Sequence, residues 1–193
     1  MELPVAERLK EFSRAVVDTK VTDKTGTELP LQEGINKSLD MINSIRETQS
    51  NLYVIGNGGS AAIASHAVID FMNVGKISAH TLHDSATLTC MANDYGYENA
   101  FSNIVKYTLK PKDILIAISS SGQSENIIAA VETSKSNDST VITLSGFKPD
   151  NKLRTTGDIN FWSNSADYGI VEIAHQFILH NIADRLVELQ DSK

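Results

Sequence analysis

Hydrophobic positions along the chain follow two alternating patterns. Short apolar runs are typical of strands buried on both faces, and between them apolar residues recur every three or four positions, as on one side of a helix. Strands are predicted at 51–55, 77–82, 114–118, 140–144 and, as an edge strand, 159–162; helices are predicted at 61–72, 85–93, 98–109, after residue 124, and at 171–189. This alternation predicts an α/β fold, a parallel sheet with helices on both faces.

The first fifty residues are predicted to be helical and to precede any strand. Apolar residues at helical spacing indicate helices over 4–18 and 31–48, and the polar segment 18–30 between them is predicted to be a loop. Their apolar stripes must be buried, and we expect them to pack both on the α/β core and on another subunit. With 193 residues the chain fits one domain, in which 1–50 is an N-terminal helical pair and 51–193 the α/β core.

The segment 114–130, ILIAISSSGQSENIIAA, carries the clearest chemical signal. Its apolar strand breaks into a turn containing Ser119, Ser120, Ser121 and Ser124, which leads directly into an amphipathic helix. Hydroxyl groups, a flexible glycine and the free N–H groups of a helix N-terminus favour an anion. The turn holds no Lys or Arg, so a phosphate ester would be bound by neutral donors. The alternative is an ordinary strand–helix loop in which a serine caps the helix.

A second glycine-rich turn, GNGGS at 56–60, connects the strand 51–55 to the helix 61–72. It lacks the Lys-Ser/Thr ending of a Walker A loop and the spacing of the dinucleotide fingerprint, which argues against a nucleotide. Ligands of parallel sheets gather at the carboxyl ends of the strands, so both turns are expected there. Asn93 and Asp94 join them if the strand that precedes them is also parallel.

Two helices carry a histidine together with a carboxylate. His66 and Asp70 are four residues apart and share a helix face, and Glu172 and His180 both lie on the last helix. A histidine and a carboxylate one turn apart, as His66 and Asp70 are, can bind one metal ion or act as an acid–base pair. Glu172 and His180 are eight residues apart and can both face a neighbouring pocket. The alternative is a helical surface pair without a chemical role, which is common.

Composition narrows the range of functions. The formal net charge of −7 argues against nucleic acid, which is bound through Lys and Arg. No apolar run approaches the roughly 20 residues of a membrane span. The one cysteine, Cys90, excludes an internal disulfide, and the N-terminus lacks the apolar core of a signal peptide. We therefore expect a cytoplasmic protein with neither a nucleic-acid nor a membrane partner.

Four motifs together resemble a known family: GNGGSAAIASH at 56–66, MANDYGYENAF at 91–101, AISSSGQSENI at 117–127 and VEIAHQFILH at 171–180. Through them the chain is similar to the sugar isomerase (SIS) domain family and, within it, to the phosphoheptose isomerases. The likeness runs from about residue 51 to 189 and is weaker before that. It implies a doubly wound, three-layer sandwich around a central parallel sheet, preceded by two N-terminal helices. It also implies a homotetramer with its sites between subunits.

The same resemblance implies an activity, the conversion of sedoheptulose 7-phosphate to D-glycero-D-manno-heptose 7-phosphate for bacterial surface polysaccharide such as lipopolysaccharide. This aldose–ketose isomerisation passes through an enediol. The resemblance assigns catalysis to Asp70, Glu172 and His180, and a zinc site to His66, Asp70, Glu172 and His180. Substrate binding is assigned to Asn57, Gly58, Gly59, Ser60, Asp70, Asn93, Asp94, Ser119, Ser120, Ser121, Ser124 and Glu172.

Two of these positions depart from the family pattern. Asp70 stands where the family has Glu, and the loss of one methylene matters because displacements of about 1 Å can cost on the order of a hundredfold in rate. Glu172 stands where the family has Gln and adds a charge. Two carboxylates and two histidines still form a sound zinc site. Three interpretations stay open: this isomerase, an isomerase of a related sugar phosphate, and a non-catalytic phosphosugar-binding or scaffold protein.

Overall fold

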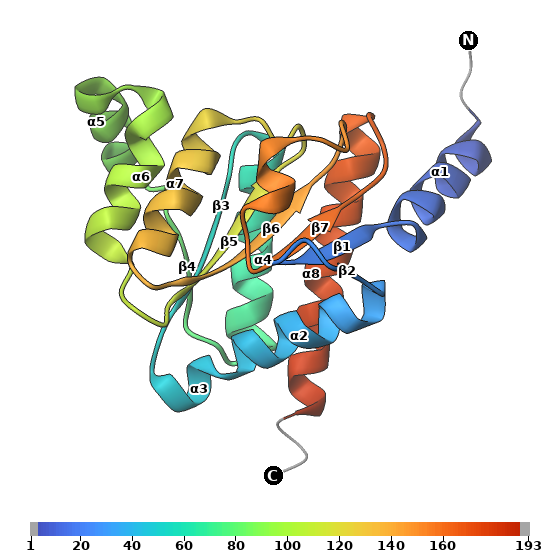
Figure 1. The fold of residues 1–193 in the computed structure, drawn as a ribbon, viewed down its shortest axis with the longest axis horizontal. Helices are drawn as coiled ribbons and strands as arrows, with labels where there is room; N and C mark the ends of the chain where they lie inside the picture. Colours follow the sequence, from blue (N-terminus) through green and yellow to red (C-terminus); the bar gives the residue numbers. More distant parts are fainter. Residues whose placement is uncertain (1–3, 190–193) are drawn as a thin grey trace.

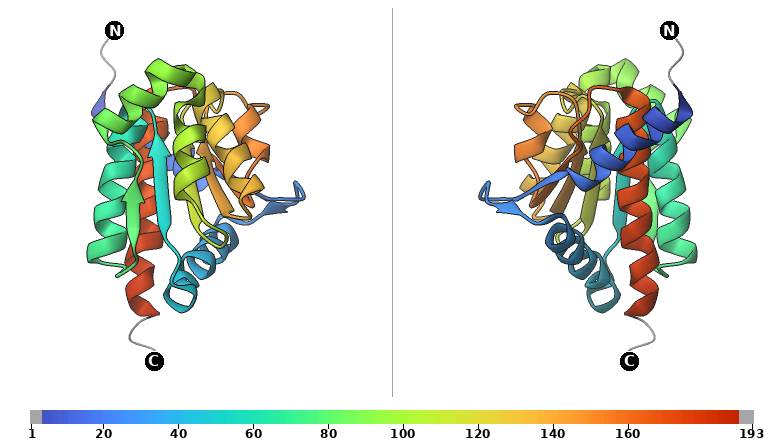
Figure 2. Two further views of the ribbon diagram at one scale, coloured as in Figure 1. Left: turned by 90° about the vertical axis from the view of Figure 1, so that its left-hand side faces the viewer. Right: turned by 90° about the vertical axis from the view of Figure 1, so that its right-hand side faces the viewer.

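The computed structural model describes residues 4–189, which form a central sheet with helices on both faces (Figures 1 and 2). The sheet in these residues has seven strands in the order β2-β1-β7-β6-β5-β3-β4. Neighbouring strands from β7 to β4 are parallel, whereas β1 runs antiparallel to both β7 and β2. The strands are β1 (Lys20–Asp23), β2 (Glu28–Leu29), β3 (Leu52–Gly56), β4 (Ala79–Thr81), β5 (Ile114–Ser119), β6 (Thr140–Ser145) and β7 (Ile159–Trp162).

The helices form two layers, with α2, α4 and α8 on one face of the sheet and α6 and α7 on the other (Figure 2). Helix α5 packs on α6, and α1 packs on α8. No helix within residues 4–189 is both long and apolar enough to cross a membrane. The helices are α1 (Val5–Val17), α2 (Leu31–Asn43), α3 (Ile45–Thr48), α4 (Gly59–Asn73), α5 (Ser85–Tyr95), α6 (Tyr97–Thr108), α7 (Glu125–Ser136), α8 (Tyr168–Glu188) and the short 3-10 helix η1 (Lys152–Thr155).

Each face of the sheet has its own hydrophobic cluster. In β5, Ile114, Ile116 and Ile118 belong to the cluster shared with α2, α4 and α8, while Leu115 and Ala117 belong to the cluster shared with α6 and α7. Successive side chains of a strand point to opposite faces, so a strand covered on both sides needs an apolar residue at every position. The predicted α/β fold is confirmed, but the sheet is mixed and mostly parallel where a parallel sheet was predicted, because β1 runs antiparallel to β2 and β7.

The prediction that two helices precede any strand is wrong, because only α1 does so. The segment 18–30, predicted to be a loop, contains the hairpin of β1 and β2. The hairpin has two apolar residues: Val21, whose side chain is fully buried beneath Gly34 of α2, and Leu29, which is partly buried against the same core. The hairpin is also held by backbone hydrogen bonds between β1 and β7. Backbone hydrogen bonds do not depend on side-chain type, so the sequence gives no sign of them.

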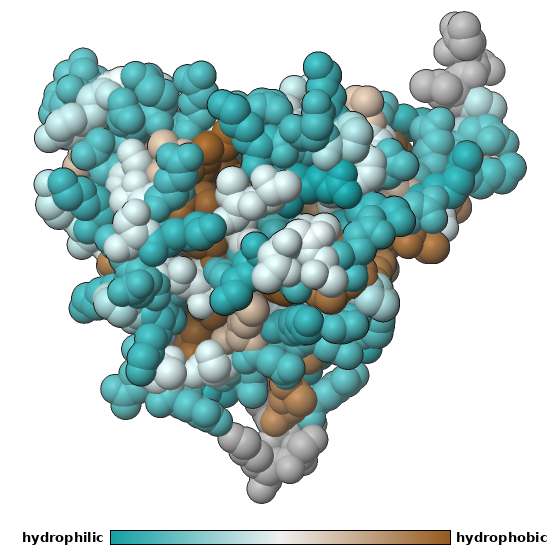
Figure 3. All heavy atoms as spheres, viewed as in Figure 1, coloured by the Kyte–Doolittle hydropathy of each residue, from teal (hydrophilic) through white to brown (hydrophobic). Residues whose placement is uncertain are grey.

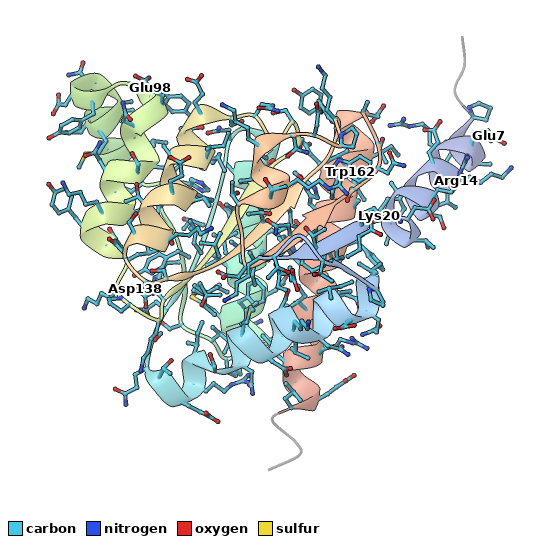
Figure 4. All side chains as sticks on the ribbon, in the orientation of Figure 1. Glu7, Arg14, Lys20, Glu98, Asp138 and Trp162 are labelled. Carbon is cyan, nitrogen blue, oxygen red and sulfur yellow. The ribbon has the colours of Figure 1, made fainter. Side chains whose placement is uncertain are left out.

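The prediction that 159–162 is an edge strand is also wrong. Strand β7 lies inside the sheet, parallel to β6 on one side and antiparallel to β1 on the other. Lys20 and Trp162 are register partners on these two strands, and Figure 4 shows them close together. The edge is therefore taken by β2, a strand of two residues. All four residues of β7 are buried, as expected of an interior strand.

Candidate active site

A small pocket lies where β3 and β5 end. Its volume is about 140 Å³, and none of the described residues that line it is Lys or Arg. The turn after β5 depends on Gly122, which has φ +63° and whose N–H donates to the carbonyl of Ser119 at 2.9 Å. The lining residues are Asn57, Ser60, Ile118, Ser119, Ser120, Ser121, Ser124, Tyr168 and Glu172; we call this the serine pocket.

Several hydrogen-bond donors of the serine pocket are not used to hold the fold together. Ser120 Oγ is buried and has no hydrogen-bond partner among the described residues. Ser119 Oγ donates to Ser124 Oγ at 3.1 Å, and Ser124 is the N-cap of α7 but makes no side-chain capping bond. The first N–H groups of α7 therefore lack the usual serine cap, and the helix N-terminus stays open to an anion.

The glycine-rich turn brings a carboxylate to the same pocket. Gly58 caps α4 with φ 53°, and Gly59 begins the helix. The carboxylate of Glu172 lies so close to Gly59 that a Cβ there would be 2.6 Å from Glu172 Cδ. A side chain at position 59 would push Glu172 away, so glycine is required for this close approach.

Helices α4 and α8 lie side by side and bring His66, Asp70 and His180 together (Figure 2). Asp70 Oδ2 is 3.5 Å from His66 Nε2 and 3.0 Å from His180 Nδ1. The two imidazole rings meet edge to face with centroids 5.0 Å apart. The Asp70 side chain is 16% exposed, against 54% for His66 and 40% for His180, so the carboxylate lies at the base of an open cluster.

This cluster has the donors of a metal centre. One ligand atom from each of the three residues lies within 4.8 Å of the other two. Ligands at 2.0–2.1 Å in a tetrahedral zinc site are about 3.3 Å apart, close to the two distances from Asp70 Oδ2. That oxygen is buried, and neither imidazole aims an N–H at it with hydrogen-bond geometry. The residues therefore fit a metal ion, with three protein ligands.

Of the four predicted metal ligands, the structure thus brings together three. Glu172 is outside the cluster and lines the serine pocket instead. Eight residues separate Glu172 from His180, which is about 12 Å along the axis of α8. The two ends of the candidate site, the serine pocket and the His66–Asp70–His180 cluster, are connected by α4 and α8, which both run from one to the other.

The predicted site residues Asn93 and Asp94 do not line the serine pocket. They lie near the end of α5, where Asn93 Nδ2 donates to Asp94 Oδ1 at 2.9 Å, and both are exposed. Strand β4 is parallel to β3, so α5 begins at the carboxyl edge as anticipated. No residue of α5 is buried, and Figure 1 shows the helix at the outside of the molecule.

Sequence reasoning missed three residues around the pocket. Tyr168 lines it, and Asn126 and Tyr97 hydrogen-bond the side chain of Asn57. Of these three residues, only Asn126 could have been noticed in the sequence, because it is an amide next to Ile127 in a predicted helix. In the structure its side chain lies on the inward face of α7 and is 3% exposed. Buried amides are hydrogen-bonded as a rule, so such a position indicates a specific partner.

The chain is similar to known proteins over most of its length. The SIS domain model matches residues 20–146. A phosphoheptose isomerase of Shewanella denitrificans is 31% identical over 188 residues, covering 93% of this chain and 94% of that protein. The chain belongs to the phosphoheptose isomerase family of SIS-domain proteins. Phosphoheptose isomerase structures from Neisseria gonorrhoeae and Francisella tularensis, each 27% identical, superpose with TM-scores of 0.82 and 0.81 over 98% of this chain and 97% of theirs.

Proposed function

We propose that this protein is an enzyme, a phosphoheptose isomerase that converts sedoheptulose 7-phosphate to D-glycero-D-manno-heptose 7-phosphate. The proposal rests on the arrangement of the candidate site. Helices α4 and α8 connect the serine pocket, which offers hydroxyl donors, to the carboxylate–imidazole pair of Asp70 and His180. An isomerase of this class needs both, because the phosphate is distant from the carbons that react.

The serine pocket is proposed to hold the phosphate. Ser119, Ser120, Ser121 and Ser124 supply hydroxyl donors, Ser60 adds another from α4, and the open N-terminus of α7 adds N–H groups. Hydrogen bonds to a charged group contribute about 1.5–3 kcal/mol each. This binding energy fixes the far end of the sugar, so that its reacting carbons are presented to the catalytic residues.

The sugar is proposed to extend from the pocket along the contact between α4 and α8. Gly58 and Gly59 let their backbone approach the chain of hydroxyl groups, and Asn57 positions this turn. The Glu172 carboxylate beside Gly59 can accept hydrogen bonds from sugar hydroxyls. Asn93 and Asp94 are proposed to reach the sugar of a neighbouring subunit, since α5 buries nothing within its own chain.

Asp70 and His180 are proposed to move the protons. A carboxylate, Asp70 or Glu172, takes a proton from C1 of the ketose while the carbonyl oxygen at C2 gains one, which gives the enediol. The oxygen at C1 then loses its proton, and C2 receives one. His180 serves the two oxygens: its Nδ1 lies 3.0 Å from Asp70 Oδ2, which leaves Nε2 for the substrate.

His66, Asp70 and His180 are also proposed to bind zinc. Three protein ligands with an open position are the usual set of a catalytic zinc site. When bound there, the ion would act as a Lewis acid on the sugar oxygens. Asp in place of the family's Glu suits this arrangement, because Asp70 already reaches both imidazoles from its place on α4.

We also propose a homo-oligomer, in line with the tetramer implied by the resemblance. Large apolar side chains are exposed on the same helices that carry the cluster: Ile69 and Met72 on α4, and Ile173 and Phe177 on α8. Exposed apolar surface around an open site is typical of a protein interface. A second copy is the occupant that would cover it and bring Asn93 and Asp94 to the substrate.

The decisive experiment measures sedoheptulose 7-phosphate turnover and zinc content before and after chelation. We expect turnover to disappear with the metal and to return with zinc. His180→Gln should abolish turnover while the protein still binds the sugar phosphate. His80→Gln is the matched control, because His80 is exposed on β4 at the edge of the sheet.

Each alternative predicts a different result. Turnover that survives chelation contradicts the zinc proposal and keeps the isomerase. Binding of sedoheptulose 7-phosphate without exchange of a carbon-bound hydrogen for solvent deuterium favours a non-catalytic phosphosugar-binding protein. Turnover of a different sugar phosphate with none of this one would identify the related isomerase.

A further inference from the structure

The side chain of Asn57, in the glycine-rich turn, is held by the protein itself. Asn57 Nδ2 donates to Asn126 Oδ1 at 2.9 Å, and Asn126 Nδ2 donates back to Asn57 Oδ1, also at 2.9 Å. The hydroxyl of Tyr97 donates to the same Asn57 oxygen at 2.7 Å. The two amides therefore form a closed pair of hydrogen bonds, and Tyr97 fixes which way the pair is oriented.

This amide pair joins the two turns of the candidate site. Asn57 follows β3 directly, and Asn126 is the second residue of α7, two positions after Ser124. Asn126 is 3% exposed, so its amide has no water to replace the bond to Asn57. A shift of either turn breaks two hydrogen bonds at once, and the glycines of one turn thereby keep a fixed place relative to the serines of the other.

Tyr97 adds a third segment to the pair. It is the first residue of α6, immediately after the helix that carries Asn93 and Asp94. Three segments with predicted substrate residues thus meet at one atom, Asn57 Oδ1. The turn is held on its other flank as well, because the Gly56 N–H donates to His83 Nε2 at 3.3 Å.

We propose that Asn126 and Tyr97 are positioning residues, which act on the substrate only through Asn57. In this arrangement the Asn57 side chain is directed inward, and the turn meets the substrate through its backbone. The inference rests on the proposed function, since it assumes that the serine pocket binds phosphate. The inference goes further than the proposed function in one respect. The affinity of the serine pocket for phosphate depends on the amide pair of Asn57 and Asn126, although neither amide side chain contacts the phosphate.

The test is a double-mutant cycle on the binding of inorganic phosphate, measured by calorimetry on the full chain. We expect Asn57→Ala and Asn126→Ala each to weaken binding by roughly tenfold, and the double variant to be no weaker than either one, because both changes break the same pair. Thermal unfolding is followed in parallel, so that binding is compared only where every variant is folded.

Two milder variants protect the test against loss of folding. Asn126→Asp still accepts from Asn57 Nδ2 but cannot donate to Asn57 Oδ1, so it should weaken phosphate binding by a smaller factor. Tyr97→Phe removes one hydroxyl and should raise the KM for sedoheptulose 7-phosphate about threefold, as expected from the loss of one hydrogen bond. Tyr107→Phe is its matched control, a tyrosine of the same helix that is 76% exposed.

Additive effects in the cycle would overturn the inference, as would unchanged phosphate binding in Asn126→Asp together with unchanged KM in Tyr97→Phe. Failure of the proposed function looks different. A protein that binds phosphate with the expected pattern but does not turn over sedoheptulose 7-phosphate keeps the inference and loses the activity. A protein that turns over this sugar while its variants all match the parent loses only the inference.

Discussion

His175 shows how one position on α8 differs from its neighbours. Glu172 and His180 lie at the two ends of the candidate site, whereas His175 between them is fully buried and its Nε2 lies 3.0 Å from the carbonyl oxygen of Ser145. Nε2–H donates a hydrogen bond to that carbonyl, which makes Nδ1 the unprotonated nitrogen of the neutral ring. Burial lowers the pKa of His175 to about 4, although the bond to Ser145 acts in the opposite direction.

This pKa gives stability a defined pH dependence. The unfolded chain, with an ordinary histidine pKa near 6.5, binds the proton more readily than the folded protein does. The contribution of neutral His175 is therefore complete above pH 6.5 and is lost as the pH falls from about 6.5 to about 4, by up to about 3 kcal/mol. Urea unfolding of the parent and of His175→Gln over this range should give a flatter curve for the variant; parallel curves would contradict the assignment.

Residue spacing predicted part of the site and failed at a definite point. His66 and Asp70 share a helix face because they are four residues apart, and His180 reaches them because α8 packs on α4. Glu172 does not reach them, since eight residues turn the side chain through about 80° and raise it by about 12 Å. The amide pair of Asn57 and Asn126 was invisible, because hydrogen bonds between distant side chains follow no period.

At the scale of elements, the strands and helices after residue 50 were predictable and the N-terminal hairpin was not. The central strands β3 and β5 are apolar at most positions, and such runs are recognisable from sequence. Strand β1 offers only Val21 to the core, and its order comes from pairing with β7, whose register partners lie 136 to 142 residues away in sequence. Pairing of that kind depends on the completed sheet.

Gly34→Ala tests whether this hairpin is an integral part of the core. Alanine stabilises a helix relative to glycine by roughly 1 kcal/mol. If residues 18–30 were a loop that did not pack on α2, the substitution would therefore stabilise the protein. In the structure a Cβ at position 34 would overlap Val21, with Val21 Cβ 3.2 Å away, and overpacking costs about 1–3 kcal/mol. We expect a net loss of stability in urea unfolding. Increased stability would mean that β1 does not pack on α2.

At the scale of the whole molecule, the two faces of the sandwich differ. The face seen in Figure 3 is mostly hydrophilic. The outer surfaces of α4 and α8, on the other side of the sheet, expose Ile69, Met72, Ile173 and Phe177. The ring of Phe177 also meets Phe12 of α1 edge to face, so α1 extends this apolar surface.

Ile173→Glu should therefore disrupt assembly. Ile173 is 56% exposed, so the change has little effect on the fold of one chain but places a charge in the proposed interface. Light scattering should show an oligomer for the parent protein and a shift toward monomer for the variant, with loss of specific activity. Tyr107→Glu, on α6 at the opposite face, should change neither quantity. A parent protein that is a fully active monomer would rule out the interface.

Because none of the described residues that line the serine pocket is Lys or Arg, the rates at which a phosphate ligand binds and leaves are affected. A phosphate site built on Lys or Arg attracts its ligand over a distance, and salt weakens that attraction. Here the chain carries a net charge of −7, and Glu172 lies in the pocket itself, so the long-range field opposes an approaching dianion. Dissolved salt screens this repulsion and thereby speeds association. Departure breaks hydrogen bonds but no ion pair with the protein's side chains, which favours rapid release of a phosphorylated product.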